Sequence, residues 1–376
     1  MRIVIAPDSF KESLPADKVA YFLQKGLEKS LPKANVKVLP LADGGEGLRA
    51  ILTPLLGLET TYQACQDMWG QEKLFPYAHK EKMALVEAAD FLGLSQIDAS
   101  ERKPLDLSSK GLGQMLYFLL CQGYEDIYLG LGGTGTHDGG LGLLEGLGYQ
   151  LLDLEGHRVE GLGRHFSRID RILPPSELTW DRVRLHLLVD VENPLTGPQG
   201  AGYVFAGQKG LPASQIPEVD RALEKLYQRI APQVISQPGA GAAGGIAAAL
   251  LAFTGARIQS GIDQVLDLLE FEEELKGADL LILGEGRFDH QSLKGKAVMG
   301  AARRAPQGLP VLLVCGNLDS SLPAFPIENI GAAFSLLQEF EDKEAVLAKA
   351  PQYLEAMGQK IGYLLNLSSK QKEQLS

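Results

Sequence analysis

RIVIAPDSFKES, residues 2–13, joins a short apolar run to a polar loop, and this combination decides the fold. The apolar run is typical of a strand that is buried on both faces of a sheet. A helix is expected after the loop, because Pro15 suits a first helical turn and Val19, Leu23 and Leu27 follow at helical spacing. A strand followed by a helix at this spacing predicts an α/β fold.

The same pattern continues, stops and resumes much later in the chain. A strand is expected at 36–42 and a helix at 46–56. The late part predicts strands at 279–284, 310–316 and 331–337, with helices at 293–305 and from about 343 to 365. Five apolar strands that alternate with helices predict a doubly wound parallel sheet of flavodoxin type.

The middle of the chain has a different pattern. Short strands are expected at 82–89, 126–132, 184–191 and 201–207, and helices at 112–123 and 217–235. We therefore expect a flavodoxin-like α/β domain, residues 1–60 and 263–376, that is interrupted by an inserted mixed-sheet α/β domain, residues 61–262. The active site is expected in the cleft between the two domains, and two sequential domains are the alternative.

Composition excludes several classes of protein. A net charge of −11 and the lack of a basic stripe argue against nucleic acid as a partner. The N-terminus enters a strand directly and no apolar run approaches the length of a membrane span, so a cytoplasmic protein without membrane association is expected. The three cysteines are far apart, which predicts neither a disulfide framework nor a zinc site. Composition does not indicate an oligomeric state.

Loops that combine acidic residues with glycine recur at the expected strand ends. They lie at 6–13, 42–47 and 284–289 in the split domain and at 133–140, 190–197 and 238–245 in the insert. Strand ends of this kind meet at the carboxyl edge of an open α/β sheet, where ligands bind. Backbone N–H groups of such glycines, and the start of a helix, favour a phosphate.

Carboxylates in the same loops would repel a phosphate unless a hard divalent cation such as Mg²⁺ lies between them. Basic side chains are also available to neutralise a phosphoryl group in transfer: Lys11, Lys209, Arg287, Lys294 and Lys296. The residues therefore predict phosphoryl transfer to a small hydroxylated substrate.

Two other functions remain open from the residues. Gly130, Gly132 and Gly135 have the G-x-G-x-x-G spacing of a dinucleotide site, and Asp153 follows at the distance of a ribose ligand, as in an NAD-dependent dehydrogenase. The poor helix formers at 136–140 weaken that interpretation. A non-catalytic sensor of phosphorylated metabolites is the second alternative.

The chain has neither a Walker A motif nor a protein-kinase motif set. Its segments PDSFKES (7–13), ADGGEG (42–47), DVENPLTGPQGA (190–201), PGAGAAGGIAAAL (238–250) and GEGRFDHQSLKGK (284–296) resemble the signature segments of bacterial-type glycerate kinase, type 1. They occur in the family's order, and the resemblance extends from residue 1 to about 340. It implies ATP-dependent phosphorylation of D-glycerate with Mg²⁺ by a two-domain enzyme. The product in such families is often 2-phosphoglycerate and in some members 3-phosphoglycerate.

Two loops depart from the family pattern. GGTGTHDGG (132–140) has Thr134 for the usual serine and His137 for the usual asparagine, which keeps a hydroxyl but adds a pH-sensitive ring. Lys110 stands where the family more often has arginine, and it lacks the bidentate fork of a guanidinium group.

With this resemblance, we assign expected roles to individual residues. Asp190 is the expected base for the C2 or C3 hydroxyl, or a metal ligand, and Asn193 would orient it. Lys11 and Arg287 would hold the substrate carboxylate or the transferred phosphoryl group. The expected Mg²⁺ ligands are Asp43, Glu285 and Asp289. The residues expected to face the phosphates of ATP are Gly132, Gly133, Thr134, Thr136, Gly241, Gly244 and Gly245. The residues expected to bind the substrate are Asp8, Ser9, Phe10, Lys110 and His137.

Overall fold

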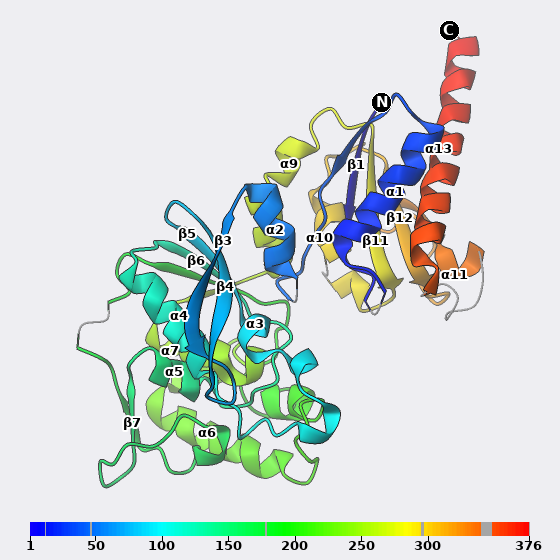
Figure 1. Ribbon diagram of the computed structural model, residues 1–376. Helices are drawn as coiled ribbons and strands as arrows, with labels where there is room; N and C mark the ends of the chain where they lie inside the picture. Colours follow the sequence, from blue (N-terminus) through cyan, green and yellow to red (C-terminus); the bar gives the residue numbers. More distant parts are fainter. Residues whose placement is uncertain (12, 46, 177–178, 295–296, 340–347, 376) are drawn as a thin grey trace. The chain divides into compact units, whose positions relative to one another are not determined.

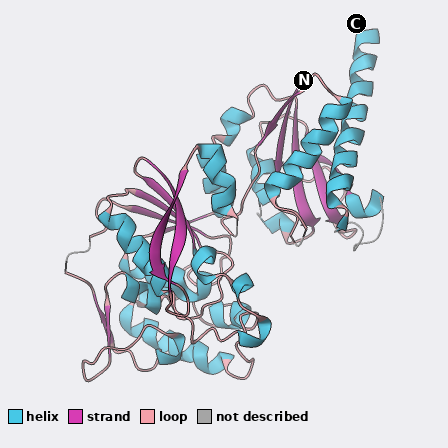
Figure 2. Cartoon of the chain, in the orientation of Figure 1, coloured by secondary structure: helices cyan, strands magenta, loops and turns pink. Residues whose placement is uncertain are grey.

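The computed structural model describes residues 1–376 except 12, 46, 177–178, 295–296, 340–347 and 376 (Figure 1). The chain divides into two compact units. The first unit consists of residues 1–43 and 262–376, and the second of residues 44–261. The helices and strands of each unit are drawn in Figure 2.

The first unit is built on a five-stranded parallel sheet. Its strands are β1 (Arg2–Pro7), β2 (Asn35–Val38), β11 (Leu280–Phe288), β12 (Val311–Leu318) and β13 (Ile330–Ser335). Their order is β13-β12-β11-β1-β2. This is the flavodoxin-like order, with the second strand at one edge and the first strand inside. The predicted doubly wound sheet is therefore confirmed.

Helices cover both faces of this sheet. One face packs against α1 (Ala16–Ser30), α11 (Leu336–Glu339) and α13 (Ala350–Leu375), and the other against α8 (Gly261–Leu268), α9 (Phe271–Glu274) and α10 (Ala297–Arg304). Alternate residues of β1 enter the two cores: Ile3 and Ile5 enter one, Val4 and Ala6 the other. The apolar run is unbroken because both faces of the strand are buried. The helix expected from 343 begins at Ala350, after a segment outside the described residues.

The second unit contains a mixed six-stranded sheet. Its strands are β3 (Glu59–Gln66), β4 (Glu72–Lys80), β5 (Met83–Glu87), β6 (Asp126–Gly130), β9 (Arg184–Leu188) and β10 (Arg257–Gln259), in the order β10-β9-β6-β5-β4-β3. Strands β5, β6, β9 and β10 are parallel, whereas β4 runs antiparallel to both β3 and β5. A separate antiparallel pair joins β7 (Gln150–Leu152) to β8 (Arg171–Leu173).

The helices of the second unit are α2 (Leu48–Leu56), α3 (Ala88–Leu92), α4 (Lys110–Cys121), α5 (Leu141–Gly146), α6 (Ile216–Ile230) and α7 (Ile246–Phe253). The strand predicted at 201–207 is wrong, because η4 (Gly202–Ala206) is a short π-helix. There the Val204 amide donates to the Gly200 carbonyl at 3.1 Å, and Tyr203 and Val204 are exposed. Because these apolar side chains are exposed, the run does not have to lie within a sheet to bury them.

Helix α2 lies in the second unit, although the expected domain limit was residue 60. The buried Glu87, at the end of β5, accepts hydrogen bonds from the amides of Gly47 at 2.7 Å and Arg49 at 2.9 Å. A carboxylate at a helix N-terminus satisfies N–H groups that have no partner within the helix. This contact fixes the start of α2 to the sheet of the second unit.

Helices α1 and α13 lie side by side and approach through glycine (Figure 1). A Cβ atom at Gly26 would lie 2.0 Å from the Glu355 carbonyl oxygen, and one at Gly358 would lie 2.3 Å from the Leu23 carbonyl oxygen. We predict that Gly26→Ala lowers the free energy of unfolding by about 2 kcal/mol or more, because the overlap outweighs the gain in helix propensity. Urea-induced unfolding measures the change.

Gly207→Ala is the matched control, because Gly207 has helical φ and ψ angles and a Cβ there would meet no heavy atom within 4 Å. We expect it to leave the unfolding midpoint nearly unchanged. Equal stability of the two variants would show that α1 and α13 can move apart to admit the added methyl group without a loss in the free energy of unfolding.

Candidate active site

In the first unit, parallel pairing brings the loop after β1 against the last residues of β11. The Asp8 amide donates to the Gly284 carbonyl at 2.8 Å. A Cβ atom at Gly286 would lie 3.0 Å from the Phe10 Cα and 3.1 Å from the Lys11 amide nitrogen. Only a glycine lets the two backbones approach so closely without a shift. The structure thus brings the predicted segments 8–11 and 285–289 into one cluster.

Asp8 is a buried carboxyl group of this cluster whose pKa is raised. Its side chain is buried, and Oδ1 accepts a hydrogen bond from the Ser9 amide at 2.6 Å. Burial and, next, the negative charge of Asp43 raise the pKa of Asp8 to about 6, whereas the Ser9 hydrogen bonds and the charge of Lys11 act in the opposite direction. Two carboxylates therefore repel each other here, with a lysine nearby.

Ser292 connects two predicted metal ligands, Glu285 near the end of β11 and Asp289 directly after it. Its buried hydroxyl lies 3.1 Å from Glu285 Oε1, and Asp289 Oδ1 accepts the Gln291 and Ser292 amides at 2.8 and 3.3 Å. Asp289 Oδ2 also lies 3.2 Å from the Nε atom of the exposed Arg287. Our sequence analysis missed Ser292, although an aspartate three residues before a serine is a common turn signal. Lys296 and the side chain of Lys294 lie outside the described residues.

In the second unit, the loops 130–140 and 238–245 interlock through their backbones. The Gly139 amide donates to the Gly244 carbonyl at 3.0 Å. A Cβ atom at Gly244 would lie 2.4 Å from the Thr136 carbonyl oxygen, and one at Gly245 would lie 2.7 Å from the Gly139 Cα. Gly244 and Gly245 also have positive φ angles. These glycines are therefore required by the loop packing itself.

The other predicted glycines have similar close neighbours. A Cβ atom at Gly132 would lie 2.6 Å from the Gly45 Cα, and one at Gly241 would lie 2.3 Å from the Pro194 carbonyl oxygen. Gly133 has a φ of 71°. The loops after β6 and β9, Gly45 and the loop 238–245 are thus assembled at one edge of the sheet.

Asp190 and Asn193 follow β9 at this edge. Asp190 is exposed, and its Oδ1 atom accepts the Gly261 amide at 3.0 Å. The Asn193 Nδ2 group donates to the Gln199 carbonyl at 2.7 Å, and the Asn193 carbonyl accepts the Gly241 amide at 3.0 Å. Asn193 therefore stabilises its own loop and connects it to the loop 238–245.

A buried polar cluster lies within the loop after β6. Lys209 is 4% exposed and donates hydrogen bonds to Thr134 Oγ1 and to the Thr136 carbonyl. His137 is fully buried, and neither ring nitrogen has a hydrogen-bond partner among the described residues. Burial, and next the charge of Lys209, lower the pKa of His137 to about 3, so the ring is neutral at physiological pH.

Asp138 anchors the same loop and was not among the predicted site residues. Its Oδ2 atom accepts the Ser109 amide at 2.8 Å and the Ser109 hydroxyl at 2.6 Å, and its Oδ1 atom accepts the Gly140 amide at 3.0 Å. Burial raises the pKa of Asp138 despite these hydrogen bonds. Lys110, next to Ser109 in sequence, pairs with Glu145, with 2.7 Å between its Nζ atom and Glu145 Oε1.

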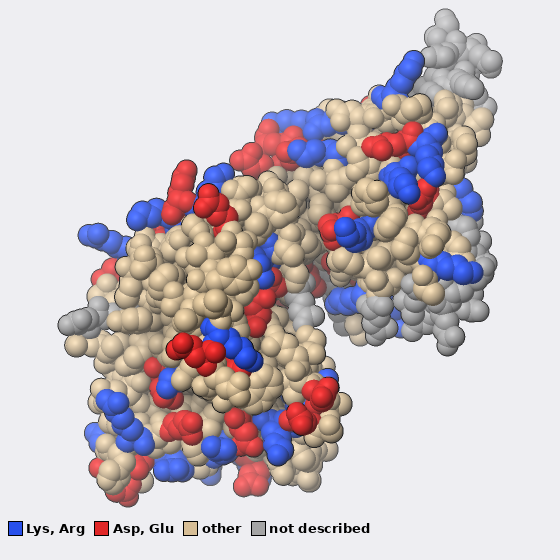
Figure 3. All heavy atoms as spheres, viewed as in Figure 1, with Lys and Arg blue, Asp and Glu red and all other residues tan. Residues whose placement is uncertain are grey.

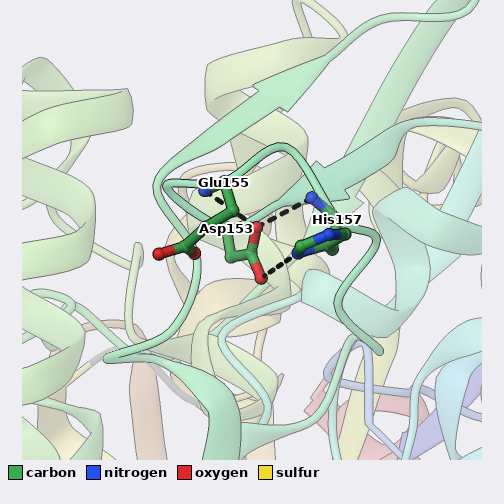
Figure 4. Close-up of side chains that lie close together, drawn as sticks. All are labelled: Asp153, Glu155 and His157. Atoms are coloured by element: carbon green, nitrogen blue, oxygen red, sulfur yellow. Dashed lines mark hydrogen bonds and ion pairs between the residues drawn. The ribbon is translucent and has the colours of Figure 1, made fainter.

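The dinucleotide fingerprint lacks its structural context. No helix opens within 130–135, since α5 begins at Leu141. Asp153 Oδ1 accepts the Glu155 and His157 amides at 3.1 and 2.8 Å, and Asp153 also pairs with the His157 ring (Figure 4). In the described part of the chain, these three are the only group of side chains arranged to share a metal ion. Hydrogen bonds of the turn account for this group, and nothing here favours a dehydrogenase.

Comparison with known proteins identifies the family. The model of the glycerate kinase family matches residues 3–366. The chain belongs to this family. It is accordingly a kinase. It is 42% identical to a glycerate kinase of Neisseria meningitidis serogroup B, over 98% of this chain and 99% of that protein. It is 36% identical to a glycerate 2-kinase of Escherichia coli K12, over 90% of this chain and 91% of that protein.

A solved structure agrees with this assignment. The crystal structure of a Salmonella typhimurium LT2 protein assigned as glycerate kinase 2 superimposes with a TM-score of 0.84 and 34% identity, covering 98% of this chain and 99% of that one. The α/β fold is therefore that of a solved member of the family.

The surface agrees with the sequence composition. Basic side chains are interspersed with acidic ones on the face shown in Figure 3. None of the helices that the structure describes combines the length and the apolar character needed to cross a bilayer.

We predict that Asp8→Asn stabilises the protein and impairs activity. The folded pKa of about 6 exceeds the ordinary 3.8, so stability falls as the pH rises from about 4 to 6 and the full cost is present above pH 6. Removing the charge should raise the free energy of unfolding by about 3 kcal/mol at pH 7. The gain should shrink as the pH falls toward 4. Chemical denaturation at several pH values measures it.

Asp181→Asn is the control, because Asp181 is an exposed aspartate. We expect it to change stability little at any pH. An Asp8→Asn variant whose stability gain did not depend on pH would contradict the assigned cause.

Proposed function

We propose that this chain transfers the γ-phosphoryl group of ATP to D-glycerate and forms 2-phosphoglycerate. The observation that carries the proposal is the assembly, within each unit, of acid-and-glycine loops at the carboxyl ends of adjacent parallel strands. Phosphoryl transfer needs groups that hold phosphates and groups that hold a hydroxylated acceptor. The name of the Escherichia coli relative, glycerate 2-kinase, supports the 2-position of the product.

We assign the phosphates of ATP to the loops 130–140 and 238–245. Helix α7 begins directly after Gly245, so its first amides supplement those of the loop, and N–H groups at a helix start favour an anion. The residues assigned to these phosphates are Gly132, Gly133, Thr134, Thr136, Gly241, Gly244 and Gly245.

We assign the acceptor hydroxyl to Asp190. Its carboxylate is exposed at the end of β9 and oriented by the Gly261 amide, as a general base requires. The hydroxyl proton passes to Asp190 while the substrate oxygen bonds to the γ-phosphorus. The bond from that phosphorus to the bridging oxygen of ATP breaks, and ADP leaves.

The exposed Lys11 and Arg287 would hold the substrate carboxylate or the transferred phosphoryl group. Asp8, Ser9 and Phe10 would shape the surface around the substrate. Because Lys110 pairs with Glu145 and His137 is buried, we propose that neither side chain contacts the substrate.

We assign Mg²⁺ to the carboxylates of the first unit, although no three of them in the described residues lie close enough to share one ion in this structure. The negative charges of Asp8 and Asp43 repel each other, and a bound divalent cation would relieve that repulsion. Carboxylate oxygens are the ligands that Mg²⁺ prefers. Asp43, Glu285 and Asp289 would hold the ion. When bound, it would neutralise phosphate charge during transfer.

The first test is an assay of the purified protein with D-glycerate, ATP and Mg²⁺. We expect ADP formation that depends on D-glycerate. Phosphorus NMR should show a doublet, from a phosphate on the C2 methine. A triplet would place the phosphate on C3 and overturn the assigned position. No ADP above the glycerate-free control would overturn the proposed activity.

We predict that Asp190→Asn lowers kcat by at least about 100-fold, the usual contribution of a general base. The amide keeps the size of the side chain and still accepts the Gly261 hydrogen bond, so folding should not change. Glu192→Gln is the matched control, because Glu192 is an exposed carboxylate two residues away. If both variants kept wild-type kcat, Asp190 would not be the base.

A further inference from the structure

Lys209 connects two segments that are distant in sequence. It follows η4 (Gly202–Ala206), and its ammonium group donates to Thr134 Oγ1 at 3.2 Å and to the Thr136 carbonyl at 2.8 Å. Both acceptors belong to the loop after β6. A single cation thus holds this loop at two alternate residues, once through a side chain and once through the backbone.

The buried charge has a cost that packing alone does not explain. An ammonium group loses hydration when it is buried, and an apolar side chain of the same length would avoid that loss. The negative charge of Asp138 compensates in part, but burial dominates and lowers the pKa of Lys209 to about 8. A cation kept at such a cost and hydrogen-bonded to a glycine-rich loop is suited to fixing that loop for an anionic ligand.

The other ionisable groups around Lys209 have partners or are neutral. His137 is uncharged, and the Tyr227 hydroxyl donates to the Gly139 carbonyl at 2.7 Å. Arg102 donates to the Gln208 carbonyl at 3.0 Å, beside Lys209. Of the charges close to the loop, Asp138 is the one that favours the protonated lysine.

We infer that Lys209 is a positioning residue for phosphoryl transfer: by holding Thr134 and Thr136 it fixes the loop after β6 in the conformation that receives the phosphates of ATP. This inference rests on the proposed function, and it assigns Lys209 an action through Thr134 rather than direct contact with the nucleotide. The charge of the lysine, and not only its size, is essential to this role.

The first experiment compares Lys209→Met with the wild type. We expect KM for ATP to rise by about 10- to 100-fold, the usual effect of losing a charged hydrogen bond in a buried site, with KM for D-glycerate nearly unchanged. Lys225→Met is the control, because Lys225 is an exposed lysine on α6. An unchanged KM for ATP in Lys209→Met would overturn the inference.

A double-mutant cycle tests the route through Thr134. If Lys209 acts by holding that hydroxyl, the combination of Lys209→Met with Thr134→Val should impair ATP use no more than the stronger single variant. Effects that multiply would show that the two residues act independently.

The pH dependence distinguishes positioning from mere support of the fold. Lys209 has a folded pKa of about 8 and an ordinary value of 10.5, so its deprotonation makes the fold relatively more stable as the pH rises between these values. A loop that needs the charge should instead lose kcat/KM for ATP above about pH 8. We therefore expect activity to fall while the contribution of Lys209 to the unfolding midpoint improves. Activity that followed stability would contradict a positioning role.

The Lys209→Met variant could fail to fold, or the wild type could lack activity toward D-glycerate. If Lys209→Met does not fold, the opposite pH trends of activity and stability in the wild type decide the question. If the wild type forms no ADP with D-glycerate, the proposed function fails, and calorimetric titration with ATP then tests the inference. An unchanged ATP affinity in Lys209→Met would overturn it in that case as well.

Discussion

The first unit depends on the parallel pairing of β1 with β11. Ile3 lies opposite Leu280 and Pro7 opposite Gly284, so residues from the two ends of the chain form the centre of one sheet. This register places the loop after β1 against the last residues of β11. The acidic cluster around Asp8 therefore depends on strands that the second unit separates in sequence. An insertion at this point leaves the pairing intact because it enters after β2, at the edge of the sheet.

The candidate site of the second unit depends on close backbone packing between loops, as the first unit depends on strand pairing. The loops of the candidate phosphate site contact one another through glycine, at distances that leave no room for a side chain. Anion binding and tight packing thus require the same residue type. Asp138 and Lys209 then stabilise the loop after β6 from two sides with buried charges. Those charges give the loop a defined conformation at a cost in desolvation.

Features that depend on a local pattern of residues could be predicted from the sequence. Unbroken apolar runs such as residues 2–7 predicted the split sheet that the structure has, and loops with acidic residues and glycine supplied the candidate site residues, whose roles stay predictions. The helical conformation of 202–206 was not predictable, because an apolar run does not reveal that its side chains face solvent. Glu87 and Ser292 were missed for another reason: their roles depend on hydrogen bonds that only the fold brings together. The burial of His137 has the same origin, since no local feature of its loop indicates it.

The close contact between α1 and α13 has a consequence for synthesis on the ribosome. Helix α1 packs against α13, which is made after the second unit, with Gly26 against the backbone at Glu355. During translation, the first 43 residues therefore wait for their partners while the whole second unit, residues 44–261, emerges. The second unit can fold while the nascent chain is still growing, whereas the first unit is completed only once residues 262–376 have also been made. Chaperones that bind exposed apolar segments would meet β1 and α1 of this chain before they meet any element of the second unit.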